Sequence, residues 1–390
     1  MTKRNRDQGS DRMVGCRKMH RNIARGLLTL LACLGLAGCS APVSHSGSML
    51  TARDRQTATL LGDGRVLISG GRSSDDSPSL DSAELFDPKT GTFSRTGSMT
   101  SPRAFHSAVL LPNGQVLVAG GQGAGDPPSN LASAELYDPA ADNFRATGSM
   151  SSPGEGQTAT LLKDGRVLVT VDLGTEADIY DPMTGKFSPT GSMAVARTND
   201  SVTLLPDGRV LIAGGETSSF NALDSAEIYD PASGTFRPTG SMTTARTDQS
   251  ATLLPDGRVL IAGGASSFSD ILDSAETYDP ATGAFSPAGS MLDVREDQTA
   301  TPLSDGRVLI VGGLGAATNG NQPILATAEL FEPKTGQFSN TGSMASSRYE
   351  HAATMLLDGR VLITGGSDNS GTLTSAEVYD PKTGAFGPAN

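Results

Sequence analysis

The chain has 390 residues, carries a formal net charge of −12 and contains no tryptophan. Its first 38 residues have a net charge of +6, and the remainder has −18. This acidic balance argues against nucleic acid as a partner, because nucleic-acid binding requires a basic surface. An acidic surface would suit a basic partner or a cation, or would simply keep the protein soluble. The length would hold two or three ordinary domains, but one repeated motif fills residues 47–390, so we expect a single large domain there.

The N-terminal segment has the pattern of a secretion signal. A basic stretch over residues 17–25 precedes an apolar stretch over residues 26–37, whose 12 residues are too few to span a membrane. The stretch ends in Leu36-Ala37-Gly38-Cys39, which resembles a bacterial lipobox. We therefore expect a lipoprotein signal peptide over residues 1–38, a lipidated Cys39 and a tether over residues 39–46. Ser40 after the cysteine is similar to the outer-membrane sorting signal of Gram-negative lipoproteins. This implies an exported protein that is anchored in the bacterial cell envelope.

The rest of the chain is built from one motif that occurs seven times. Its Gly-Ser-Met triplets are 43 to 53 residues apart and begin at Gly47, Gly97, Gly148, Gly191, Gly240, Gly289 and Gly342. The first copy predicts strands over residues 57–61, 65–69, 83–86 and 92–93. Asp63-Gly64 predicts a tight hairpin between the first two strands, and Asp87-Pro88 with Gly91 predicts a turn between the last two. Seven such units predict an all-β, seven-bladed β-propeller over residues 47–390, with four antiparallel strands per blade and no strand exchanged between blades.

Further residues recur in register with these strands. A Gly-Gly doublet follows the second strand in six repeats, and an aromatic residue precedes the Asp-Pro or Glu-Pro turn in all seven. The fourth strand carries a phenylalanine in every repeat: Phe93, Phe144, Phe187, Phe236, Phe285, Phe338 and Phe386. With these features residues 47–390 resemble the kelch family, as in the central domain of galactose oxidase, although kelch repeats usually carry tryptophan at the last position. We expect these phenylalanines to pack between blades. The resemblance implies a ligand face made of the loops before the first strand and after the Gly-Gly doublet.

An arginine before the first strand and a glutamate on the third strand occur together in six repeats. The arginines are Arg53, Arg103, Arg197, Arg246, Arg295 and Arg348, and the glutamates are Glu84, Glu135, Glu227, Glu276, Glu329 and Glu377. In the third repeat both positions differ, to Gly154 and Asp178. Because the two positions depart together, we interpret them as a structural pair that bridges strands, in preference to ligand-binding residues.

The positions that differ between repeats are better candidates for a ligand site, since a ligand meets an asymmetric surface. They follow the repeated arginine, and we expect them to surround the mouth of the central channel. The first two positions contribute Asp54, Arg55, Phe105, Glu155, Asn199, Asp248, Asp297, Tyr349 and Glu350, and the next position adds His106 and His351. Solvated loop ends and buried hydrogen bonds are the alternative interpretation of these residues.

Copper oxidases on a kelch scaffold, such as galactose oxidase, need a cross-linked Tyr–Cys pair, histidine ligands and a stacking tryptophan. All three cysteines of this chain lie within its first 39 residues, so we expect no such centre and no other cofactor. Calcium held by carboxylates at the mouth is not established by the sequence.

The sequence favours an envelope-anchored, non-enzymatic binding module that recognises a protein or a glycan on the loop face. Contact with a membrane would be through the lipid anchor alone. The alternative is a periplasmic sugar epimerase similar to the sialic-acid mutarotases, for which Glu350, His351 and Arg55 could supply an acid–base pair and an arginine. A structural scaffold of the envelope is a third interpretation.

Overall fold

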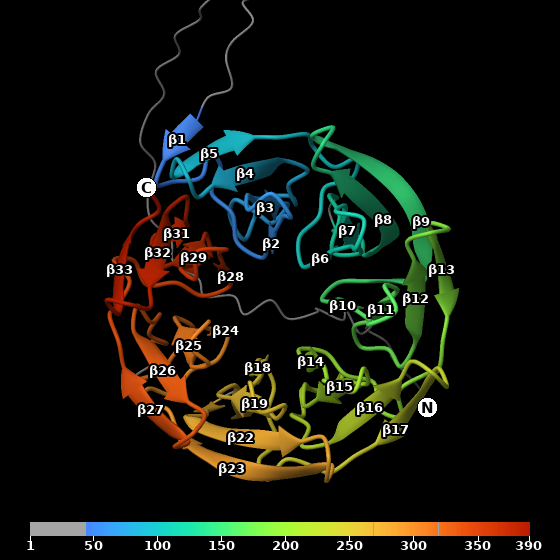
Figure 1. Ribbon diagram of the computed structural model, residues 1–390, viewed down its shortest axis with the longest axis vertical. Helices are drawn as coiled ribbons and strands as arrows, with labels where there is room; N and C mark the ends of the chain where they lie inside the picture. Colours follow the sequence, from blue (N-terminus) through green and yellow to red (C-terminus); the bar gives the residue numbers. More distant parts are fainter. Residues whose placement is uncertain (1–43, 126, 268, 319) are drawn as a thin grey trace, which may run out of the picture. The chain divides into compact units, whose positions relative to one another are not determined.

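A computed structural model describes residues 44–125, 127–267, 269–318 and 320–390 of the protein. The predicted signal peptide and Cys39 lie outside these residues. The described part consists of strands, turns and loops. It contains no helix that is long and apolar enough to cross a membrane. Seven four-stranded antiparallel units surround a central axis (Figure 1), which confirms the predicted seven-bladed β-propeller.

Within each blade the strands follow one another from the axis outward in chain order. Blades one and two contain β2 (Thr57–Leu60), β3 (Val66–Ser69), β4 (Ala83–Asp87) and β5 (Thr92–Arg95), then β6 (Ser107–Leu110), β7 (Val116–Ala119), β8 (Leu131–Asp138) and β9 (Asn143–Gly154). Blades three and four contain β10 (Thr158–Leu161), β11 (Val167–Thr170), β12 (Ala177–Asp181) and β13 (Lys186–Pro189), then β14 (Ser201–Leu204), β15 (Val210–Ala213), β16 (Ala226–Asp230) and β17 (Thr235–Pro238).

Blades five to seven repeat this arrangement. They contain β18 (Ser250–Leu253), β19 (Val259–Ala262), β22 (Ser274–Asp279) and β23 (Ala284–Ser290), then β24 (Thr299–Pro302), β25 (Val308–Val311), β26 (Ala328–Glu332) and β27 (Gln337–Asn340), then β28 (Ala352–Met355), β29 (Val361–Thr364), β32 (Ala376–Asp380) and β33 (Ala385–Pro388). Two small hairpins, β20 (Ala265–Ser267) with β21 (Asp270–Ile271) and β30 (Ser367–Asp368) with β31 (Gly371–Thr372), extend from blades five and seven.

The hydrophobic core lies between neighbouring blades. Between blades one and two, Leu67 and Leu85 pack against Val118, Tyr137 and Phe144. Tyr137 and Phe144 are opposite each other on β8 and β9, with ring centroids 4.8 Å apart. The same aromatic pair recurs in every blade at 4.8 or 4.9 Å. The predicted packing of the phenylalanines between blades is confirmed.

The predicted arginine–glutamate pair is also confirmed, and it lies within each blade. In blade five the Nη2 atom of Arg246 donates to Oε1 of Glu276 at 3.0 Å, and its Nη1 donates to the carbonyl oxygen of Gly263 at 2.9 Å. Nη–Oε distances of 2.7 to 3.2 Å occur in all six such blades. In blade three Asp178 instead accepts from the amide and the hydroxyl of Ser151. The arginine thus binds the first glycine of the doublet, which explains why the blade without the arginine also lacks the doublet.

The ring closes between blades seven and one through the start of the chain. Gly47 forms a β-bridge with Ala389 of blade seven, and Ser48 forms one with Ser375. The amide of Met49 donates to the carbonyl oxygen of Thr374 at 2.8 Å. Each blade still supplies its own four strands, as expected. The predicted tether of residues 39–46 needs a correction, because β1 (Ser44–Ser46) pairs antiparallel with β5 and adds a fifth strand at the outer edge of blade one.

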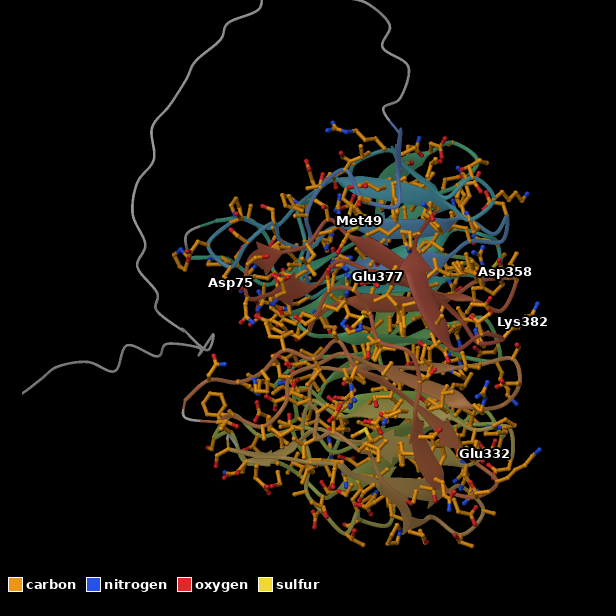
Figure 2. All side chains as sticks on the ribbon, turned by 90° about the vertical axis from the view of Figure 1, so that its left-hand side faces the viewer. Met49, Asp75, Glu332, Asp358, Glu377 and Lys382 are labelled. Carbon is orange, nitrogen blue, oxygen red and sulfur yellow. The ribbon has the colours of Figure 1, made fainter. Side chains whose placement is uncertain are left out.

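The propeller has two different faces. We call the one that carries the loops before the innermost strands and after the Gly-Gly doublets the loop face, and the one that carries the Asp-Gly and Asp-Pro turns the turn face. Figure 2 shows Asp75, from a loop after the doublet, on one side of the molecule, with Asp358 and Lys382, from the turns, on the other. The candidate residues predicted from the sequence all occur at the loop end of the innermost strands.

Candidate ligand-binding site

A ring of left-handed residues surrounds the axis on the loop face. In every blade the second residue after the position of the repeated arginine has a φ of 52–71°: Arg55, Phe105, Gly156, Asn199, Asp248, Asp297 and Glu350. Backbone hydrogen bonds join these residues from blade to blade. The amide of Phe105 donates to the carbonyl of Arg55 at 3.1 Å, and that of Arg55 donates to the carbonyl of Glu350 at 3.2 Å. Side chains larger than glycine are unfavourable in this conformation. The mouth therefore presents six side chains in spite of backbone strain.

Arg55 connects this ring to several carboxylates. Its Nε lies 2.8 Å from Oε2 of Glu350 in blade seven, and its Nη1 lies 3.0 Å from Oδ1 of Asp75. A third carboxylate, that of Asp54, is 3.9 Å away. The structure thus brings Arg55 and Glu350 together, as the sequence predicted, and adds Asp75, which the sequence analysis did not select.

Phe105 forms an aromatic platform beside this network. The guanidinium carbons of Arg55 and Arg72 lie 4.8 and 5.3 Å from its ring centroid, within the range of a cation–π contact. Glu155 is half-buried nearby. Burial raises the pKa of Glu155, while the charges of Arg72 and Arg55 oppose the increase. Arg72 was also missed by the sequence analysis, although an arginine directly after the Gly-Gly doublet occurs in the first repeat alone.

From Glu350 the ring continues with acidic residues. Asp248, Asp297 and Glu350 come from blades five, six and seven in succession. Burial raises the pKa of Glu350 to about 8, with the nearby carboxylates of Asp297 and Asp54 adding to the effect and Arg55 opposing it. Asn199 and Gly156 provide neutral positions between the acidic part and the part that contains Phe105. The mouth is therefore asymmetric in charge, although the fold that carries it is repetitive.

Three of the predicted mouth residues prove to be buried in the walls between blades. His106 and His351 have their Nε2 atoms 3.0 and 2.9 Å from the hydroxyl oxygens of Thr57 and Thr299 in the preceding blades. Burial lowers the pKa of both histidines to about 3. Asp54 is 1% exposed and accepts a hydrogen bond from the hydroxyl of Ser367 at 2.7 Å. The structure thus places these side chains in the walls between blades, one step from the ring of mouth residues, and their role in a ligand site stays a prediction.

Blade three adds a carboxylate that the sequence analysis did not select. Asp172 directly follows Thr170-Val171, which replaces the Gly-Gly doublet of the other blades. Burial raises the pKa of Asp172 to about 7, and the like charges of Glu155 and Asp200 contribute to the increase. Among the residues that the structure describes, no group of three histidine, cysteine or acidic side chains is arranged to hold a metal ion. The arrangement supports ligand binding through an aromatic ring, arginines and carboxylates.

The turn face of the described chain carries two hollows. One, of about 350 Å³, is lined by Leu253, Pro255 and Pro302 among others, and the second, of about 340 Å³, lies beside Leu357 and Asp358. Both are at the far ends of the innermost strands from the mouth residues. They therefore contribute nothing to the predicted site.

Comparisons with known proteins agree with the architecture. A model of the Kelch motif matches residues 55–100 and 348–386, in the first and last blades. A solved structure of a fungal alcohol oxidase of the AA5 family, in complex with copper, is similar in fold, with a TM-score of 0.69 over 86% of this chain and 76% of that one, at 17% sequence identity. No curated protein sequence matches the chain. The fold and the motif define a seven-bladed propeller with Kelch motifs.

The copper of that oxidase raises the question of a similar centre here. His106 and His351 belong to different blades, and both point an Nε2 atom at a threonine hydroxyl of the preceding blade. Tyr137, Tyr180, Tyr229, Tyr278 and Tyr379 each pack on a phenylalanine of their own blade. These donors do not converge, so the residues described do not fit a copper site.

Proposed function

We propose that the protein is a non-enzymatic binding module whose loop face recognises a protein or a glycan. The observation that carries the proposal is the ring of left-handed residues. Its backbone repeats in all seven blades, while its side chains range from Arg55 and Phe105 to Asp248, Asp297 and Glu350. Backbone strain at bulky residues is typical of functional positions. A face that combines an aromatic ring with charges of both signs suits a polar partner.

Thermal unfolding of the protein with a panel of sugars, including sialic acid, and with candidate envelope proteins tests this function. A partner present at 100 times its dissociation constant should stabilise the fold by about 2.7 kcal/mol. Phe105→Ala should abolish that stabilisation. Met183→Ala, which changes an exposed residue of a turn, is the control and should retain it. A partner that stabilises both variants equally would argue against the loop face as the binding surface.

We also propose that the propeller is anchored in the bacterial envelope through a lipid on Cys39. Support comes from the apolar stretch and from Leu36-Ala37-Gly38-Cys39. Metabolic labelling with a fatty acid, followed by fractionation, tests the proposal. Cys39→Ser should lose both the label and the membrane association. Labelling that persists in this variant would refute it.

A sugar epimerase is a second candidate, favoured by the pKa of about 8 that burial gives to Glu350. A carboxyl with such a pKa can hold a proton near neutral pH and act as a general acid. His351, however, is buried and bound to Thr299, so Glu350 and Arg55 would have to suffice. A mutarotation assay decides the matter. Turnover that is lost in Glu350→Gln would replace the binding function with an enzymatic one.

A further inference from the structure

Arg72 is a buried arginine without a direct ion pair among the described residues. It is 8% exposed, and the nearest carboxylate whose charge it influences is that of Glu155. Its guanidinium has the ring of Phe105 as a neighbour at 5.3 Å, and no described carboxylate lies within 4.0 Å of it. The backbone holds it in place, because Arg72 and Asp54 exchange both amide–carbonyl hydrogen bonds at 3.0 Å. The position is therefore well defined, and the charge at its end has no direct ion pair among the described residues.

The other buried arginines show how the chain treats such a group. Each of the six repeated arginines binds a glutamate and two carbonyl oxygens of its own blade, as Arg53 does with Glu84, Gly70 and Ser82. Arg55 has three carboxylates around it. Arg72 has no direct partners of this kind among the described residues, and a guanidinium in such a position favours the approach of an anion. The contrast indicates that the described residues do not supply Arg72 with the direct carboxylate partner that the other buried arginines have.

The surroundings restrict the chemistry of that partner. A contact with an aromatic ring uses the face of a guanidinium, so the N–H groups at its edge remain suited to a carboxylate. The carboxylate of Glu155 interacts with Arg72, and those of Asp75 and Glu350 pair with the neighbouring Arg55, so the surroundings would repel a chain of negative charges. The site therefore suits a ligand with a single carboxylate.

We infer that Arg72 binds the carboxylate of a singly acidic ligand on the loop face, with Phe105 beside it. The inference rests on the proposed binding function and names the chemistry of the group that is recognised. Such a carboxylate could belong to an acidic sugar or to the end of a peptide chain.

The test uses the full chain and two pairs of small probes that differ in one carboxylate. Galacturonate is compared with galactose, and N-acetylglycine is compared with N-acetylglycinamide, by titration calorimetry or ligand-observed NMR. We expect a probe with a carboxylate to bind with a Kd on the order of 1 mM, and its neutral counterpart not to bind. The pair that shows the difference tells whether the source is a sugar or a peptide.

Variants separate Arg72 from the general charge of the protein. Arg72→Gln should weaken binding of the acidic probe about tenfold or more, since hydrogen bonds to charged groups contribute strongly. Arg72→Lys, which keeps the charge and loses the planar edge, should have an intermediate effect. Arg237→Gln removes the same charge from an exposed position on β17 and should change nothing. Circular dichroism verifies that the variants fold.

Three results would overturn the inference. The first is that neither acidic probe binds, and the second is that Arg72→Gln binds like the unchanged protein. The third concerns Glu155, the nearest rival partner of Arg72. Glu155→Gln should leave binding of the acidic probe equal or tighter, and a loss of binding would show that Glu155 is required. If Phe105→Ala loses its partner while Arg72→Gln keeps it, the proposed function stands and this inference alone fails.

Discussion

In six of the seven blades, a buried arginine connects three strands of its blade through one side chain. In blade five Arg246 donates to the carbonyl oxygens of Gly263 and Ser274 and to the carboxylate of Glu276. Glu276 also accepts from two backbone amides, those of Thr243 and Thr244. A pair that is satisfied in this way keeps its charges, whereas the loss of one partner leaves the other charge buried alone.

We therefore predict that Glu276→Ala lowers the free energy of unfolding by about 3–5 kcal/mol. Burial lowers the pKa of Arg246, and the charge of Glu276 opposes this, so its removal leaves the cost of burial uncompensated. Chemical denaturation measures the effect. Arg258→Ala is the control, because it breaks the exposed pair with Asp256 and should cost no more than about 1 kcal/mol. Equal losses in the two variants would contradict the structural role of the buried pair.

Asp172 provides a prediction for pH dependence. Burial raises its pKa in the folded protein to about 7, whereas an aspartate in an unfolded chain has a pKa of about 4. Between these values the folded protein binds a proton that the unfolded chain has lost, so this residue makes stability fall as pH rises from about 4 to 7. Asp172→Asn should therefore gain stability relative to the unchanged protein across that window. Thermal unfolding of both proteins at several pH values measures the difference.

The difference between the two proteins isolates Asp172 from other titrating groups. His106 and His351, whose pKa values are lowered to about 3, destabilise the fold as pH falls, and they do so in both proteins. A constant difference between pH 4 and 8 would show that Asp172 titrates normally.

At the scale of the strands, the Gly-Gly doublet allows the end of the second strand of one blade to approach the next blade closely. The first glycine of blade five, Gly263, has a φ of 65°. A Cβ atom at Gly263 would lie 2.5 Å from the carbonyl oxygen of Arg295 in blade six and 2.8 Å from the side-chain amide of Gln298. Glycine is thus required at this position both by the close contact between blades and by the positive φ of the turn.

Gly263→Ala should accordingly destabilise the protein by about 2–4 kcal/mol, through strain and overpacking. Gly62→Ala is the matched control, since a Cβ there would meet nothing within 4 Å. It should change the free energy of unfolding by no more than about 0.5 kcal/mol. Denaturant titration of both variants measures the two effects, and similar values would mean that the close approach between blades is easily relieved.

The elements themselves could be predicted because each is specified by local residues. Asp-Gly and Asp-Pro-x-x-Gly determine the turns, and the joint departure of Gly154 and Asp178 revealed the arginine–glutamate pair. The mouth was predicted less well, because three consecutive positions were treated as equivalent, whereas successive residues of an extended chain point to different sides. His106 and His351 therefore enter the wall, one step beyond the ring. Arg72 has no direct ion pair among the described residues because of how the loops of different blades pack, and no sequence pattern indicates this.

At the scale of the whole molecule, the propeller is a closed ring made from an open chain. Six junctions between blades are crossed by the chain, which passes from the fourth strand of one blade to the first strand of the next. The junction between blades seven and one is held without such a connection. Its bonds include those of Met49 to Thr374 and of Gly366 to Arg53, together with the ion pair of Arg55 and Glu350. Arg55 thus serves the closure of the ring as well as the mouth.

We predict that this junction opens before the others, since opening it requires no change in the covalent path of the chain. The amide of Gly366, which donates to Arg53 across the junction at 3.0 Å, should exchange its hydrogen faster than that of Gly71, which donates to Arg103 across the next junction at 2.8 Å. Arg55→Gln should accelerate exchange at Gly366 and leave Gly264 unchanged. The amide of Gly264 donates to Arg295 at 2.9 Å between blades five and six, far from the ion pair of Arg55 with Glu350. Hydrogen exchange followed by mass spectrometry or NMR measures these amides. Protection at Gly366 equal to or greater than that at Gly71 would mean that the segment Gly47–Met49 closes the ring as firmly as a covalent connection does.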